Sequence, residues 1–146
     1  MQLKNKWLFA TPLLAIISMI TSSFSSLPGG DSYKIYVNNK LVCQRYLYEE
    51  KALQTLTWTQ SNYNDKVDIY YSHCGTVGKN RVIAIKDAQN NILKKWVFAD
   101  AKGNNKSMSC TVKDILNAGK NNSTIYLYYT SAELPKGKLL AAVKGS

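Results

Sequence analysis

Residues 33–48 read YKIYVNNKLVCQRYLY and decide the fold that the sequence predicts. Every second residue from Tyr33 to Val37 is apolar or aromatic, and successive side chains of a β-strand point to opposite faces. Asn38 and Asn39 follow, and asparagine tolerates the left-handed backbone that a two-residue hairpin turn needs. A second run begins directly after them. The stretch therefore predicts two antiparallel strands joined by a tight turn.

The same alternation recurs along the rest of the chain. Short runs rich in β-branched and aromatic residues are separated by turns that contain Asn or Gly, which favours strands. These runs cover residues 53–58, 66–73, 81–87, 92–99, 107–112, 123–130 and 138–143. Strands at spacings of about 8–12 residues are typical of a sandwich or barrel. We predict an all-β fold, a single antiparallel β-sandwich of about eight strands.

Helical signals are confined to two segments. Residues 112–118 predict one short helix, with Thr111 as its N-cap and Gly119 as the residue that ends it. Residues 49–56 contain good helix formers, but their last apolar positions alternate as in a strand. We therefore predict a strand that spans residues 53–58 and no helix in this segment.

Lys94 conflicts with simple alternation, because the pattern places it on the same face as the apolar Trp96. Either the strand at residues 92–99 lies at the edge of the sandwich, or its predicted register is shifted.

Residues 1–26 differ in composition from the rest of the chain. Lys4 and Lys6 precede an apolar stretch at residues 8–20, and small polar residues follow it, which is the layout of a secretory signal peptide. The stretch is shorter than the roughly 20 residues of a membrane-spanning helix, although an uncleaved anchor is the alternative. We predict a signal peptide at 1–26, a β-sandwich domain at 27–146, export to the periplasm or beyond, and no membrane span after cleavage.

Composition narrows the class of protein. The chain has 146 residues, of which 45% are hydrophobic, and this excludes a disordered polyelectrolyte. Its net charge is +10, and removal of residues 1–26 takes away two lysines and no acid, which leaves +8. A basic surface favours anionic partners such as acidic polysaccharide. We expect no nucleic-acid partner.

Several short motifs resemble a known group of proteins. They are YYSHCG at 70–75, IKD at 85–87, FAD at 98–100, LYY at 127–129 and ELPKG at 133–137. In this combination the chain resembles small secreted β domains of Bacteroidota-type bacteria, over most of residues 27–146. The resemblance implies export and a β fold, and it implies no particular activity.

His73 and Cys74 form the sharpest catalytic candidate. A cysteine nucleophile needs a histidine within hydrogen-bond reach, and Asp68 or Asn80 could supply a third member. Neighbouring residues of a strand point to opposite faces, however, so the pair is poorly placed unless Gly75 turns the backbone. We therefore expect a hydrogen-bonded histidine at a strand end and no catalysis, with a thiol-dependent enzyme or redox protein as the alternative.

The three cysteines allow one disulfide bridge. Cys43 and Cys110 alternate with apolar residues and are expected to point inward, whereas Cys74 is expected to point outward or lie at a strand end. If a bridge forms, we predict that it joins Cys43 to Cys110 and leaves Cys74 as a reactive thiol. Three unpaired thiols are the equal alternative, because sequence alone does not determine connectivity.

Other site chemistries are weakly supported by the sequence. One histidine and three scattered cysteines lack the close spacing of a zinc site, and no calcium-loop motif occurs. Residues 75–79, GTVGK, have two residues between their glycines, where a phosphate-binding loop has four. We predict no metal and no cofactor.

Ten tyrosines accompany the basic charge, and their rings could stack on sugars. The candidate binding residues lie opposite the most apolar strand faces or in the turn near residues 74–80. They are Tyr36, Tyr70, Tyr126, Tyr128, Lys79 and Arg81. The alternative is that these faces are partly covered and that lysine only keeps the protein soluble and its sheet edges unpaired.

These observations favour a non-catalytic interaction or scaffold module of the cell envelope, whose partner is a polysaccharide or another exported protein. An acidic-glycan-binding module that uses a basic, tyrosine-rich face is the second hypothesis, and the thiol enzyme is the third.

Overall fold

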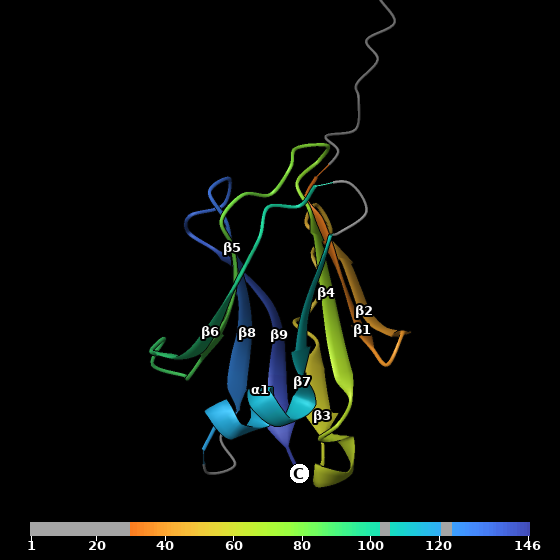
Figure 1. Cartoon of the computed structure of the whole chain (residues 1–146), viewed down its shortest axis with the longest axis vertical. Helices are drawn as coiled ribbons and strands as arrows, with labels where there is room; N and C mark the ends of the chain where they lie inside the picture. The colour runs from red at the N-terminus through yellow and green to blue at the C-terminus, as the bar shows by residue number, and fades with distance from the viewer. Residues whose placement is uncertain (1–29, 103–105, 121–123) are drawn as a thin grey trace, which may run out of the picture.

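The chain folds into two facing β-sheets, and the computed structural model describes residues 30–102, 106–120 and 124–146. The predicted signal peptide at 1–26 lies outside the described residues. The first sheet has four strands in the order β2 (Lys40–Tyr46), β1 (Ser32–Val37), β4 (Lys66–Ser72) and β7 (Ser107–Thr111). The second has five in the order β3 (Thr55–Trp58), β9 (Lys138–Gly145), β8 (Ile125–Thr130), β5 (Arg81–Lys86) and β6 (Ile92–Phe98). The 3-10 turn η1 (Gln60–Asn62) and the helix α1 (Val112–Ala118) complete the described fold (Figure 1).

The predicted all-β sandwich is confirmed, with nine strands where about eight were expected. The first hairpin forms as predicted, since β1 pairs antiparallel with β2 through Asn38 and Asn39. Their φ angles are 48° and 65°, the left-handed values that a type I′ turn requires.

One strand pairing corrects the expectation of a wholly antiparallel sandwich. β3 runs parallel to β9, while the other strand pairs of the described sheets are antiparallel. After β2 the chain leaves the edge of the first sheet and joins the edge of the second, where the N–H of Ala142 donates to the carbonyl of Gln54 at 2.9 Å. Period-two alternation is the same for both strand directions, so the pattern did not predict this parallel pair.

The core lies between the sheets and consists of the alternating residues that point inward. Ile35 of β1, Ile69 of β4 and Met108 of β7 form one cross-strand row of the first sheet, and all three are fully buried. Ile83, Leu127 and Tyr129 face them from the second sheet and are also fully buried. The opposite face of each sheet is thereby left for polar and aromatic side chains.

Lys94 lies on the side of β6 that alternation predicts. A charged side chain is tolerated there because β6 is an edge strand. It lies on the same side of β6 as Trp96, with its Nζ 5.0 Å from the centre of that ring. At the edge its ammonium group reaches Asp114 of α1, with Nζ 2.8 Å from Oδ1. The strand therefore lies at the edge, as the first explanation states, and the register of β6 also shifts between Ile92 and Lys94, which leaves Ile92 exposed.

Helix α1 has the predicted bounds. The hydroxyl of Thr111 accepts the N–H of Asp114 at 3.1 Å, as an N-cap does. Gly119 ends the helix for a different reason from the expected one, because its φ is −90° and not left-handed. A Cβ at this position would lie 2.6 Å from Cγ2 of Ile125, so β8 packs too close for any side chain.

The predicted Cys43–Cys110 disulfide is wrong. Cys43 lies on β2 and Cys110 on β7, at opposite edges of the first sheet with β1 and β4 between them. Three strand spacings amount to about 14 Å, whereas bridged cysteines have Cα atoms less than about 7 Å apart. Both residues are buried as expected and Cys74 is exposed, and all three are unpaired.

We predict that Gly119→Ala lowers the free energy of unfolding by about 1–3 kcal/mol, because the new methyl group overpacks against Ile125. Gly119→Asn serves as the control, since asparagine is tolerated where a helix ends in a left-handed residue. Urea unfolding should show that Asn is no better than Ala. If Asn restores wild-type stability, backbone conformation and not close packing requires the glycine.

Thiol titration provides a second test of the fold. In the native protein one thiol, that of Cys74, should react rapidly, and three should react after unfolding without reductant, because Cys43 and Cys110 are buried and unbridged. Cys74→Ser should remove the fast phase alone. A total of one thiol in the unfolded protein would contradict the strand order given above.

Candidate functional site

A groove runs along the outer face of β1 and β4 in the first sheet. Its volume is about 650 Å³, and its lining extends from Asn39 in the hairpin to Lys106, which directly precedes β7. Tyr36 and Tyr70 stand on neighbouring strands of this face, with ring centres 5.5 Å apart and planes nearly perpendicular. The alternation that buries Ile35 and Ile69 places these two rings on the outer face of the sheet, where Tyr36 is half-buried and Tyr70 is exposed.

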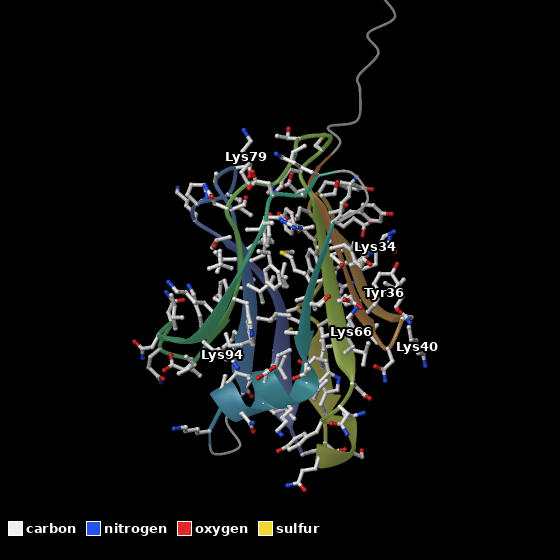
Figure 2. The ribbon with its side chains drawn as sticks, in the orientation of Figure 1. Lys34, Tyr36, Lys40, Lys66, Lys79 and Lys94 are labelled. Atoms are coloured by element: carbon white, nitrogen blue, oxygen red, sulfur yellow. The ribbon has the colours of Figure 1, made fainter. Side chains whose placement is uncertain are left out.

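Lysines surround the two rings. Lys34 lies beside Tyr70 in the strand register, and Lys34 and Lys106 both line the groove. Lys66 extends from β4 on the same face (Figure 2). Aromatic rings with ammonium groups around them suit an anionic ligand that also presents a flat apolar surface.

Asp68 is the acidic residue among those that line the groove. It points to the outer face of β4, yet its side chain is only 6% exposed. Its Oδ1 accepts the hydroxyl of Ser109 on β7 and lies 3.0 Å from Nζ of Lys66. A negative charge therefore sits low in a groove that is otherwise basic.

The predicted tyrosine set divides between the two faces of the sandwich. Tyr36 and Tyr70 belong to the first sheet, whereas Tyr126 and Tyr128 lie on β8 in the second sheet. Both β8 rings are half-buried, and Nζ of Lys86 lies 4.4 Å from the centre of the Tyr128 ring. The six predicted residues thus do not form one surface.

The two predicted basic residues lie elsewhere again. Lys79 is exposed in the loop before β5, at the opposite end of the molecule from α1 in Figure 2. Arg81 is 2% exposed, and its guanidinium donates to the carbonyls of Ala99 and Lys106 at 2.7 and 2.8 Å. Arg81 anchors the connection between β6 and β7, so we leave it out of the binding surface.

His73 and Cys74 point in different directions. The chain turns at Cys74 and Gly75, with φ angles of 43° and 84°, and the N–H of Thr76 donates to the carbonyl of His73 at 2.8 Å. His73 is 7% exposed, while Cys74 faces solvent. The turn does not bring imidazole and thiol together. Neither Asp68 nor Asn80, the two suggested third members, contacts the imidazole.

The partners of His73 come from parts of the chain that the sequence did not connect with it. Nδ1 lies 3.3 Å from Oδ2 of Asp31, and Nε2 lies 2.9 Å from the Tyr129 hydroxyl and 3.1 Å from the Ser131 hydroxyl. Tyr71 donates to the same carboxylate at 3.0 Å and stacks on Tyr129, with ring centres 4.2 Å apart. No local sequence motif predicts this cluster, because its members are spread from residue 31 to residue 131.

The order Asp31, His73, Ser131 is that of a hydrolase triad, but its surroundings are those of a structural network. Ser131 is only 5% exposed, and its hydroxyl accepts the N–H of Leu134 at 3.2 Å. Gly78 packs over the imidazole so closely that a Cβ there would lie 3.3 Å from Cδ2 of His73. A nucleophile must be reached by substrate, and Ser131 is almost completely buried while Gly78 covers the imidazole beside it.

No helix among residues 30–102, 106–120 and 124–146 is long and apolar enough to cross a membrane. Over the same ranges, no three His, Cys, Asp or Glu side chains gather into a group that could hold a metal ion.

Burial shifts the acidity of several core groups. It raises the pKa of Tyr33 to about 12 and that of the Cys110 thiol to about 12. Burial also raises the pKa of Tyr71 and Tyr129, and the hydrogen bond to Asp31 raises that of Tyr71 further. The neutral forms of all four groups are favoured by folding.

Comparison with known proteins adds no assignment, because no family model and no curated protein matches this chain.

The raised pKa values predict loss of stability at alkaline pH. The unfolded chain releases these protons first, so the free energy of unfolding should fall as pH rises from about 9 toward about 12. Urea unfolding at about pH 8 and about pH 11 measures the slope. Tyr33→Phe should make the slope shallower, although loss of the hydrogen bond from Tyr33 to the Leu140 carbonyl costs about 1 kcal/mol at pH 8. An unchanged slope in that variant would contradict the assignment.

Proposed function

We propose that the protein is an exported, non-catalytic binding module that holds an acidic glycan in the groove on the outer face of β1 and β4. The observation that carries the proposal is the pair of rings on the outer face, the half-buried Tyr36 and the exposed Tyr70, with Lys34 and Lys106 in the same groove and Lys66 beside Asp68. The proposal unites the first two hypotheses from the sequence and moves the binding face away from β8.

The shape of the groove supports an extended ligand. It is an open channel that follows the strands from Asn39 toward Lys106, so a polymer could lie along it without an end entering the protein. Rigid tyrosine rings provide apolar contact at little entropic cost, and the lysine ammonium groups attract carboxylates from a distance. Both contributions suit a chain of charged sugars.

The chemistry of the groove supports binding without turnover. Hydrolysis of a glycoside by the usual route needs two carboxyl groups on either side of the scissile bond. Asp68 is the single carboxylate among the described residues that line the groove, and Ser109 and Lys66 already occupy its Oδ1. The expected signal peptide would deliver the protein to a compartment that contains polysaccharide.

A rival proposal, binding of another exported protein, has its own observation. Ile92, Leu93 and Val97 of the edge strand β6 are 59%, 41% and 72% exposed. An edge strand with exposed apolar side chains can pair with an extended segment of another chain. Lys94 and Lys95 lie among them, and lysine is a common device against such pairing. For this reason we place the glycan groove first.

Retention on immobilised polygalacturonate tests the proposal. The wild-type protein should be retained at low salt and released near 1 M salt, where the Debye length is only about 3 Å. Tyr36→Ala and Tyr70→Ala should each weaken binding by about five- to tenfold, since central aromatic anchors contribute on the order of 1 kcal/mol or more.

The matched control is Tyr126→Ala, which removes a half-buried ring from the opposite sheet and should leave retention unchanged. The proposal fails if retention is insensitive to salt, or if the Tyr126 variant loses as much binding as the Tyr36 and Tyr70 variants. If Val97→Lys loses retention while Tyr36→Ala and Tyr70→Ala keep it, the rival surface on β6 is favoured.

A further inference from the structure

We infer that Asp68 is the specificity-determining residue of the groove and that it selects an acidic ligand that also carries free hydroxyl groups. The inference rests on the proposed function and narrows it from anionic polymers in general to carboxylated polysaccharides. Its basis is a charged side chain that is more than nine-tenths buried and that lines the groove among lysines.

Asp68 occupies a costly position. It lies on the outer face of a central strand, between Tyr36 on β1 and Ser109 on β7 in the strand register. A buried carboxylate loses much of its hydration, and only hydrogen bonds or opposite charges offset that loss. A neutral side chain such as asparagine or serine would avoid the cost and would still suit the outer face of a sheet.

The partners that Asp68 has within the protein use one of its two oxygens. Ser109 and Lys66 both contact Oδ1, and no hydrogen bond to Oδ2 is formed by the residues that the structure describes. An ionised carboxylate has room for about four donors and donates none. The remaining capacity on the groove side can accept hydroxyl groups from a ligand.

Neutralisation of Lys66 does not explain the acid. The Lys66 side chain is 60% exposed, so water can solvate its ammonium group without a protein partner. A negative charge is also unfavourable in a groove that only has to attract polyanions.

A carboxylate among lysines distinguishes two kinds of anionic polymer. A polymer with acidic groups and no hydroxyl groups is attracted by the lysines but repelled by Asp68, and it offers no donor to replace water at Oδ2 of Asp68. A carboxylated sugar places hydroxyl donors beside each acidic group, and these can donate to Asp68 while the lysines pair with the acids. Asp68 thus lowers affinity for the first kind and raises it for the second, which is how polar groups create selectivity.

The test compares two carboxylate polymers, polygalacturonate with hydroxyl groups and polyacrylate without them. By titration calorimetry at fixed low salt, the wild-type protein should bind polygalacturonate more tightly per carboxylate. Asp68→Asn should weaken polygalacturonate binding by about three- to tenfold and strengthen polyacrylate binding, so that the preference disappears.

Three variants control for other effects. Glu50→Gln removes one negative charge from an exposed loop position and should leave the preference intact. Ser109→Ala removes a partner of Asp68 but keeps the carboxylate, and it should also retain the preference. If Asp68→Asn does not fold by urea unfolding, Asp68→Ser gives a smaller neutral replacement for the same comparison.

The outcomes separate the two proposals. If the wild-type protein binds both polymers equally, or if Asp68→Asn strengthens both by the same factor, Asp68 acts only as a charge and the inference is overturned while the groove remains a binding site. If the wild-type protein binds neither polymer, the proposed function and the inference fail together.

Discussion

The structure depends on the burial of one face of each sheet against the other. Ile35, Ile69 and Met108 on one side, and Ile83 and Leu127 on the other, are removed from water because their strands alternate with a period of two. The same geometry forces the intervening residues outward. Tyr36 and Tyr70 lie on the outer face because their neighbours in the chain supply the core, so the groove is a consequence of the packing that holds the sheets together.

At the end of the sandwich opposite α1, the space between the sheets is filled by hydrogen-bonded polar side chains and not by aliphatic ones. His73 continues the inward face of β4, and Tyr129 meets it from β8, so their contact at 2.9 Å joins the two sheets. Asp31 and Ser131 occupy the other positions around the imidazole, and Arg81 holds the connection between β6 and β7 nearby. Buried polar groups of this kind are costly when they are unpaired, and here His73, Tyr129 and Ser131 each have a hydrogen-bond partner.

The groove and this cluster each contain one acidic side chain, but the surroundings of the two carboxylates differ. In the cluster Oδ2 of Asp31 accepts the hydroxyl of Tyr71 and lies 3.3 Å from Nδ1 of His73, and both of these partners are buried. In the groove Asp68 has donors on Oδ1 only, from Ser109 and Lys66, and its surroundings are basic and open to solvent. The partners of Asp31 are thus buried side chains of the core, whereas Asp68 lies on an outer sheet face, where its second oxygen can gain a donor from a ligand.

The sequence by itself determined the all-β class, the first hairpin, helix α1 and the direction of most side chains. These features follow from local rules: the period of two, the left-handed tolerance of Asn38 and Asn39, and the capping hydroxyl of Thr111. Only the tertiary structure decided which strands are neighbours. That order separates Cys43 from Cys110, divides Tyr36 from Tyr126, makes β3 parallel to β9, and brings Asp31 to His73. Alternation states which face a side chain occupies and carries no information about the strand beside it, because pairing is set by the shape and burial of the whole sandwich.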